Sequence, residues 1–344
     1  MAKEKSTINK QSFDIDSIKK QFSSSSKMKP NEFLNCGEAF TDACGIPGPA
    51  VGHLNMFIGH SDTGKTTALI KAAIDAQRKG KLPIFIITEK KWDFEHAQNM
   101  GLDCYQNENG EWDGQFLFND NFDYIEQIFD YINQIIDEQE KENIPMDTVF
   151  FWDSLGSIQC KMNMEGGGGN MHNARVISEG INSKISGRIT RTRKEEVPYT
   201  STLVLINQPY VTPPDNPYEA PEIETKGGKS TYQACSIAFL FGGKKKAGVN
   251  EIQAVNNKRR IAYAKRTKVQ VLKNHVNGYT FKDGKLIITE HGFIRDNKKE
   301  LDNYKEQYKE YWSSKLGSEN FALEEESSEE EENEETEGVQ DSSD

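Results

Sequence analysis

The chain has 344 residues and a formal net charge of −12, a length that suits one large domain with appendages or two domains. No apolar run approaches the roughly 18 residues that span a membrane, and the N-terminal Met-Ala-Lys-Glu-Lys lacks the apolar segment of a secretory signal. The five cysteines show neither Cys-x-x-Cys pairs nor metal-ligand spacing, so we expect a reduced, cytoplasmic protein without a membrane partner.

Charge and polarity are concentrated at the two ends of the chain. Residues 324–344 hold twelve Asp or Glu and no Lys or Arg, so this segment carries −12 and residues 1–323 sum to zero. Its composition predicts a disordered acidic tail. Residues 1–32 are polar and include four consecutive serines, which predicts an arm or linker, with the alternative of a short amphipathic helix between Phe13 and Phe22.

Residues 59–66 form the first strong motif, a phosphate-binding loop. Gly-His-Ser-Asp-Thr-Gly-Lys-Thr matches G-x-x-x-x-G-K-[ST] at every fixed position and lies between an apolar run and a stretch of helix formers. In such a loop the backbone N–H groups bind phosphate, the Lys65 ammonium reaches the β- and γ-phosphates, and the Thr66 hydroxyl ligates Mg²⁺. The expected nucleotide-binding residues are Gly59, His60, Ser61, Asp62, Thr63, Gly64, Lys65, Thr66 and Thr67.

Strands and helices then alternate along the chain. Apolar runs predict strands at 54–58, 83–88, 148–152, 202–206 and 236–241, and Ile spacing predicts a helix at 121–140. Residues 105–120 are expected to be loop. Later strands are expected at 269–272, 279–281 and 286–289, around an Asp283-Gly284 turn, followed by a Lys/Glu-rich helix at 296–316. This order predicts an α/β fold with a mostly parallel sheet covered by helices on both faces.

Three polar side chains, Glu89, Asp153 and Gln208, follow predicted strands. Because the carboxyl ends of parallel strands meet at one edge of a sheet, we expect them beside the phosphate-binding loop. Asp153, followed by Ser154, is the expected acid that steadies Mg²⁺, Glu89 is the general base that orients the attacking water, and Gln208 contacts the γ-phosphate. The alternative for each is a structural side chain at a strand end. Together they predict hydrolysis of a nucleoside triphosphate.

Two segments are rich in positive charge. Residues 170–194 contain six Lys or Arg and one acid, and residues 226–273 contain twelve and one acid. Next to the four glycines at 166–169, these segments suit the backbone of a nucleic acid, with solvated surface lysines as the alternative. The acidic tail would then compete with DNA for the basic surface, or act only on solubility.

Several motifs together resemble the RecA family of strand-exchange ATPases, most closely the phage UvsX-type recombinases. Between about Phe33 and Ile294 they follow the family order: Gly59 to Thr66, Ile87-Thr-Glu89, Phe151-Trp-Asp-Ser-Leu155, Leu205-Ile-Asn-Gln208, Lys226-Gly-Gly228 and Leu272-Lys-Asn-His275. The resemblance implies a RecA-like ATPase core at 33–295, a polymerisation arm at 1–32, a charged helical extension at 296–323 and the tail at 324–344. The interior of the phosphate-binding loop and the region after residue 295 depart from bacterial RecA, which favours the phage-type branch.

The resemblance also implies roles for individual residues. Gln208 resembles the switch residue that couples nucleotide to DNA. Lys273 matches a catalytic lysine that reaches the γ-phosphate of a neighbouring subunit, and His275 stands where bacterial RecA has a second such cation. Two mobile DNA-binding loops are implied at about 162–173 and 209–228. The implied DNA-binding residues are Gly166, Gly167, Gly168, Gly169, Asn170, Arg175, Lys226, Gly227, Gly228 and Lys229.

The function implied by the resemblance is ATP- and Mg²⁺-dependent homologous recombination. The chain would form helical filaments on single-stranded DNA and exchange strands with double-stranded DNA, with single-strand-binding and mediator proteins as partners, in the host cytoplasm if it is viral. A hexameric replicative helicase and a regulatory RecA-like paralogue are the alternatives. Only about fifty residues precede the phosphate-binding loop, which disfavours a helicase with an extra N-terminal domain. The presence of Lys65, Thr66, Glu89 and Asp153 disfavours an inactive regulatory paralogue. The aromatic residue that contacts the base stays open, with Tyr124 and Phe122 as candidates.

Overall fold

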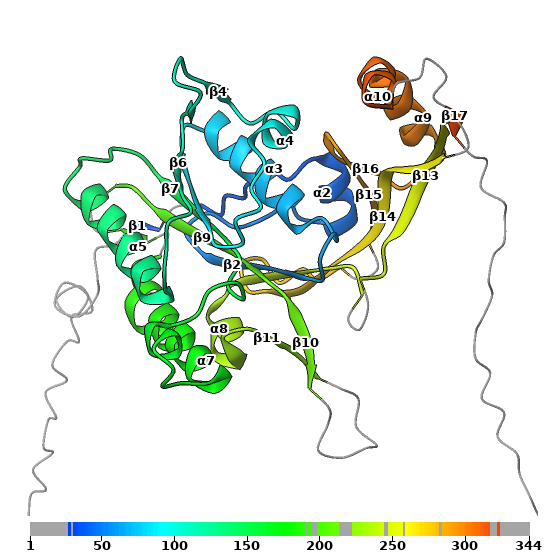
Figure 1. Ribbon diagram of the computed structural model, residues 1–344. Helices are drawn as coiled ribbons and strands as arrows, with labels where there is room; N and C mark the ends of the chain where they lie inside the picture. Colours follow the sequence, from blue (N-terminus) through cyan, green and yellow to red (C-terminus); the bar gives the residue numbers. More distant parts are fainter. Residues whose placement is uncertain are drawn as a thin grey trace, which may run out of the picture.

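The computed structural model describes residues 27–28, 30–189, 192–193, 198–212, 222–243, 247–256, 259–281, 284–316 and 322–323. An eleven-stranded sheet runs through this part of the chain (Figure 1). Its parallel portion contains, in spatial order, β6 (Leu117–Asn119), β3 (Leu82–Ile87), β7 (Thr148–Asp153), β9 (Ser201–Asn207), β2 (Leu54–Gly59) and β12 (Ile237–Phe241). The sequence prediction of a mostly parallel α/β sheet is therefore confirmed.

The sheet continues beyond β12 with antiparallel strands, which need no crossover helices between them. This portion contains β14 (Arg259–Asn274), β15 (Gly284–Thr289), β16 (Gly292–Arg295), β13 (Asn250–Asn256) and β17 (Ala322–Leu323). Three separate two-stranded sheets pair β1 (Lys27–Met28) with β8 (Thr192–Arg193), β4 (Cys104–Gln106) with β5 (Trp112–Gly114), and β10 (Pro209–Thr212) with β11 (Glu222–Thr225).

Helices cover both faces of the sheet (Figure 1). One face carries α2 (Glu38–Cys44), α3 (Lys65–Arg78) and α4 (Phe94–Asn99). The other carries α5 (Ile125–Glu140), α7 (Asn170–Glu179), the π-helix η1 (Gly180–Ile185) and α8 (Gly228–Ala234), with the short α6 (Lys161–Met164) before α7. The pair α9 (Lys298–Gln307) and α10 (Lys309–Leu316) packs on the antiparallel end. Among the described residues, no helix is long and apolar enough to cross a membrane.

The two helical layers enclose two hydrophobic cores because neighbouring side chains of a strand point to opposite faces. In β7, Phe151 packs in the core beneath α3, whereas Phe150 and Trp152 pack in the core beneath α5. The central strands are buried on both faces, which explains why they read as continuous apolar runs in the sequence.

The structure corrects several predicted boundaries. The helix predicted at 121–140 begins only at Ile125, because the Gln127 side chain accepts hydrogen bonds from the N–H groups of Asp123 and Tyr124 and holds them outside the helix. The predicted loop at 105–120 contains β5 and β6, and β4 reaches into it. The aromatic rings of Phe94, Phe116 and Phe118 pack together there and hold the segment against the sheet.

The antiparallel end also differs from prediction. The strand predicted at 269–272 is part of the sixteen-residue β14, and the one predicted at 279–281 is absent, with Tyr279 and Phe281 exposed between β14 and β15. Asp283 lies outside the described residues. The single helix expected at 296–316 is two helices, separated at Tyr308, whose ring stacks on His291 at a centroid distance of 3.5 Å. Residues 1–26 and 29 of the predicted arm at 1–32 also lie outside the described residues, as does the acidic tail at 324–344.

Candidate functional site

The phosphate-binding loop is the turn between β2 and α3. β2 ends at Gly59 and α3 begins at Lys65. A Cβ on Gly59 would lie 2.7 Å from the Phe241 carbonyl oxygen of β12, so only glycine allows this close approach of the strands. Gly64 caps the helix with φ of 98°. The unpaired N–H groups at the start of α3 favour an anion at this position.

Lys65 lies inside the loop. Its ammonium donates to the His60 carbonyl at 2.5 Å, and the Thr63 hydroxyl donates to the same oxygen at 2.8 Å. The side chain is buried, and burial lowers the pKa of Lys65, while the negative charges of Asp153 and Glu89 oppose that shift. The loop therefore holds a positive charge at its centre.

Asp153, at the end of β7, lies beside the start of α3. The Thr66 hydroxyl donates to its Oδ2 at 3.0 Å, and the side chain is only 8% exposed. Burial, with the nearby Glu89 carboxylate, raises the pKa of Asp153 to about 6, although the Thr66 hydrogen bond and the Lys65 charge act in the opposite direction. Two adjacent oxygen ligands suit a hard cation such as Mg²⁺, which typically takes its other ligands from phosphate and water. Among the described residues, no group of three or more His, Cys, Asp or Glu could hold a metal.

Glu89 follows β3 and is tied to the end of the neighbouring β7. The Ser154 hydroxyl donates to Glu89 Oε1 at 2.6 Å, and the Thr88 hydroxyl donates to the Ser154 carbonyl at 2.8 Å. The peptide bond between Asp153 and Ser154 is cis. Ser154 thus positions the carboxylate predicted to be the general base, a contact for which the sequence holds no signal.

The predicted strand-end residues and the loop share one cavity of about 180 Å³. Its walls are formed by Ser61, Asp62, Lys65, Thr66, Ile87, Glu89, Lys91, Trp92, Asp153 and Gln208. The four predicted elements meet here because β2, β3, β7 and β9 are neighbours in one parallel sheet and present their carboxyl ends at the same edge. The cavity therefore combines a cation, two adjacent oxygen atoms that suit a divalent cation, and a second carboxylate.

Gln208 connects this cavity to the β10–β11 hairpin. The side chain of the preceding Asn207 is fully buried, and its Oδ1 accepts from the N–H groups of Gln208 at 2.9 Å and of Lys226 at 3.1 Å. Its Nδ2 donates to the Lys226 carbonyl at 2.9 Å. One amide therefore holds both ends of the hairpin segment. The only signal in the sequence is a polar residue directly after the apolar run of β9.

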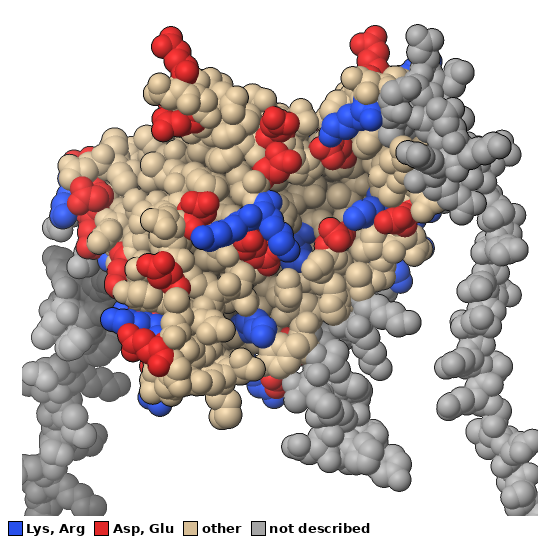
Figure 2. All heavy atoms as spheres, in the orientation of Figure 1, with Lys and Arg blue, Asp and Glu red and all other residues tan. Residues whose placement is uncertain are grey.

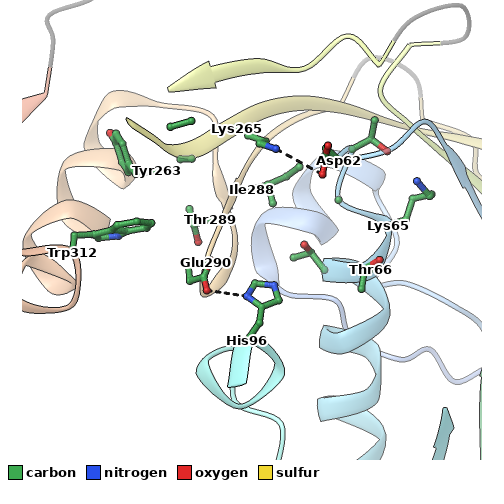
Figure 3. A pocket seen from close by; sticks show the side chains of 15 residues that line it. Asp62, Lys65, Thr66, His96, Tyr263, Lys265, Ile288, Thr289, Glu290 and Trp312 are labelled. Atoms are coloured by element: carbon green, nitrogen blue, oxygen red, sulfur yellow. Dashed lines mark hydrogen bonds and ion pairs between the residues drawn. The ribbon is translucent and has the colours of Figure 1, made fainter. Parts of the chain in front are cut away.

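A second, larger cavity of about 410 Å³ lies on the other side of the loop (Figure 3). It extends from Gly64, Lys65, Thr66 and Thr67 to side chains of β14, α4, α10 and the β15–β16 turn. Of these, Lys265 belongs to the predicted basic segment, whereas no sequence pattern indicates a role for His96, Tyr263, Glu290 and Trp312. Lys265 and Asp62 face each other across it at 3.8 Å. Tyr124 and Phe122, the candidates for contact with a base, line neither cavity. The Tyr124 ring lies beneath the Lys161 ammonium, and Phe122 packs against Tyr131.

The first predicted DNA-binding loop lies between α6 and α7. Gly166, Gly167, Gly168 and Gly169 connect these helices, and Asn170 begins α7. Arg175, on α7, donates to Glu179 at 2.7 Å, with both side chains exposed. Three methionines around this loop, Met162, Met164 and Met171, are also exposed.

The second predicted DNA-binding loop is described only in part, because residues 213–221 lie outside the described residues. Lys226 lies over the Tyr210 ring at 5.7 Å. Gly227 has φ of 83°, and a Cβ there would lie 2.5 Å from Ile177, so it packs α8 closely on α7. Gly228 begins α8, and Lys229 lines a cavity of about 190 Å³ with Tyr232.

The predicted basic surface is only partly a free surface. On the face shown in Figure 2, Lys and Arg side chains are interspersed with Asp and Glu. Arg266 pairs with Asp296 at 2.7 Å. Lys273 lines neither cavity beside the loop. Its ammonium donates to the carbonyls of Gln233 at 2.7 Å and Tyr232 at 3.2 Å, at the end of α8.

The buried carboxyl of Asp153 carries a stability prediction. Its pKa is raised from 3.8 to about 6, so it favours folding below pH 4 and loses that contribution as the pH rises through 6. Asp153→Asn is therefore expected to raise the free energy of unfolding at pH 8 by about 1–3 kcal/mol, measured by urea denaturation without ligand. Asp302→Asn, at an exposed position of α9, serves as the control. A less stable Asp153→Asn chain would show that Lys65 and Thr66 outweigh the cost of burial.

Comparison with known proteins gives the family of the chain. Residues 3–293 match the family described as the RecA N-terminal domain. Curated proteins named Protein RecA are similar to it: that of a Nitratiruptor species is 26% identical over 246 residues, which cover 69% of this chain and 64% of the relative. That of an Arthrobacter species is 28% identical over 202 residues, 56% of this chain and 51% of the relative. That of Wigglesworthia glossinidia brevipalpis is 25% identical over 279 residues, 76% of this chain and 72% of the relative.

The chain thus spans about half to two thirds of the length of the first two relatives. The family match extends over most of the chain and includes the phosphate-binding loop, the strand-end residues and both predicted loops. The chain therefore belongs to the RecA N-terminal domain family.

Proposed function

We propose that this protein is an ATP-dependent DNA recombinase of the phage UvsX type, which forms filaments on single-stranded DNA and exchanges strands with homologous double-stranded DNA. The observation that carries the proposal is the 180 Å³ cavity, in which Lys65, Thr66, Glu89, Asp153 and Gln208 meet. ATP hydrolysis requires positioned charges rather than covalent chemistry from the protein, and this cavity supplies them.

Four residues of the cavity, together with Ser154 beside it, take separate parts in the hydrolysis. Lys65 and the N–H groups at the start of α3 bind the phosphates of ATP. The Thr66 hydroxyl and the Asp153 carboxylate, 3.0 Å apart, hold Mg²⁺, which would neutralise phosphate charge. Glu89 accepts a proton from the attacking water, and the Ser154 hydroxyl holds its carboxylate at 2.6 Å in the required position.

Gln208 and Asn207 would couple nucleotide binding to DNA binding. Gln208 lines the cavity, and the Asn207 amide bonds both to Gln208 and to Lys226 at the far end of the hairpin segment. A shift of Gln208 toward the γ-phosphate would therefore move the hairpin segment as a unit. DNA is held by this segment, residues 209–228, and by the glycine loop within residues 162–173, through the ten DNA-binding residues named from the sequence.

In the filament, a lysine from a neighbouring subunit would complete the nucleotide site. Lys273 lines neither cavity of its own chain and is only partly buried, which favours its assignment to the nucleotide of a neighbouring subunit. Residues 1–32 would be the polymerisation arm, 33–295 the ATPase core, 296–323 the helical extension and 324–344 the acidic tail. Single-strand-binding and mediator proteins would load the filament in the cytoplasm.

Adding single-stranded DNA is expected to raise ATP turnover by about tenfold or more. DNA bound to the two loops would fix Gln208 at the γ-phosphate, and this positioning would accelerate hydrolysis. Steady-state phosphate release with and without DNA measures this effect.

Electron microscopy with DNA and a non-hydrolysable ATP analogue should show helical filaments. Closed six-membered rings would identify a helicase instead, and DNA-independent turnover would indicate a regulatory paralogue.

A further inference from the structure

The 410 Å³ cavity has two chemically different ends (Figure 3). Lys65, Thr66 and the start of α3 lie at one end, where N–H groups and an ammonium favour phosphate. Trp312, Tyr263 and Glu290 lie at the other end, which is aromatic and acidic. A role for this second end rests on the proposed binding of ATP, because it concerns the part of the nucleotide that the phosphate-binding loop does not hold.

Glu290 makes the far end unsuitable for phosphate. Its carboxylate lies 3.1 Å from His96 Nδ1 and 3.5 Å from the Lys315 ammonium. The hydrogen bond from His96, supported by the charges of His96 and Lys315, lowers the pKa of Glu290 to about 2. An ionised carboxylate repels phosphate and accepts hydrogen bonds from hydroxyl and amino groups, which are the polar groups of a nucleoside. The charges at the two ends therefore favour a nucleotide whose nucleoside points toward Glu290.

Trp312 lines the same end of the cavity. Its indole N–H donates to the Tyr304 hydroxyl at 3.2 Å, and its ring meets Tyr263 edge-on at a centroid distance of 6.0 Å. These contacts fix the orientation of the ring, and the side chain is 7% exposed. A buried aromatic ring whose own polar atom is satisfied offers a stacking surface for a base.

The helix that carries Trp312 lies outside the matched family region, which ends at residue 293. It is nevertheless fixed to the core, because Trp312 packs in one hydrophobic cluster with Tyr304 and Ile287. The Lys315–Glu290–His96 chain of charges also links α10 to α4 through the turn between β15 and β16. We propose that α10 is a functional part of the nucleotide site, and that Trp312 binds the nucleoside of ATP.

The test compares ATP with inorganic tripolyphosphate, which can occupy only the phosphate-binding loop. Titration calorimetry with Mg²⁺ gives the dissociation constants of tripolyphosphate and of a non-hydrolysable ATP analogue. Trp312→Ala is expected to weaken binding of the ATP analogue by about tenfold while the affinity for tripolyphosphate changes by less than about twofold. Trp312→Phe, which keeps an aromatic wall, should retain most of the affinity. Glu310→Ala, at an exposed position of α10, serves as the control.

The outcomes separate this inference from the proposed function. Unchanged ATP affinity in Trp312→Ala, or an equal loss for ATP and tripolyphosphate, would overturn the role of Trp312. Equal loss would show that α10 acts only through the stability of the fold, and retained tripolyphosphate binding shows that the loop is intact. If the unmodified chain bound neither ligand, that result would contradict the proposed ATPase function, and with it the role of Trp312.

Discussion

Glu89→Gln is expected to lower ATP turnover by about 10²–10⁴-fold, the usual contribution of a positioned general base, with little change in ATP affinity. Gln keeps the size of the side chain and still accepts the Ser154 hydrogen bond, but it cannot take a proton from water. Steady-state phosphate release and equilibrium ATP binding, measured on the same preparation, separate the two effects. DNA-bound filaments of the variant should persist with ATP, because hydrolysis no longer ends them.

Glu95→Gln is the matched control, because Glu95 is an exposed carboxylate on α4 that lines neither cavity. A second readout comes from Asp153, whose pKa of about 6 is raised in part by the charge of Glu89. In Glu89→Gln that contribution is absent, so the pKa of Asp153 should fall and Mg²⁺-dependent binding should persist to a lower pH. Loss of ATP binding in Glu89→Gln at neutral pH would show that Glu89 holds the nucleotide rather than activating water.

Lys65→Ala is expected to weaken ATP binding by about 10²-fold or more, as for loss of one partner of a buried charge pair. The ammonium lies inside the loop, and the substitution removes a positive charge that interacts with both Asp153 and Glu89. Calorimetric titration with the non-hydrolysable ATP analogue measures the loss. The fold should survive, because the Thr63 hydroxyl still donates to the His60 carbonyl.

Lys79→Ala is the control for Lys65→Ala, since Lys79 lies just after the other end of α3 and lines neither cavity. Its ammonium forms partly exposed ion pairs, which contribute little, and donates to the Phe33 carbonyl at 2.7 Å. Lys65→Arg is not expected to restore binding, because the planar guanidinium does not fit a pocket shaped for a point charge. Undiminished ATP affinity in Lys65→Ala would mean that residues 59–66 do not bind phosphate in this chain.

The local elements were predictable where one physical signal dominated. The buried strands appear in the sequence as continuous apolar runs, and the α5 stripe appears as isoleucines spaced three and four apart, of which Ile128 and Ile132 are fully buried. Predictions were wrong where tertiary packing decided the outcome. β6 forms because its aromatic neighbours dock on β3, and Tyr308 ends α9 where its ring meets His291.

The candidate site divides in the same way. Its phosphate-binding loop and strand-end residues follow from a motif and from the rule that parallel strands present their carboxyl ends at one edge. Short-range sequence patterns do not reveal the roles of Ser154, Asn207 and Trp312. These roles depend on hydrogen-bond partners 65, 19 and 8 residues away in the chain, respectively. The sequence signal for α10 is a set of aromatic residues that recur at spacings of three and four and would share one face of a helix: Tyr304, Tyr308, Tyr311 and Trp312.

Short-range pattern and composition are sufficient to specify the fold class, the phosphate-binding loop and the identity of the residues at its edge. The role of Asn207, whose buried amide holds both ends of a predicted DNA loop, emerges only from the packed chain, as does the wall that α10 adds to the larger cavity. Hydrogen bonds and packing between such distant segments depend on the order of strands in the sheet. That order is set by the free energy of the whole core rather than by any local stretch of residues.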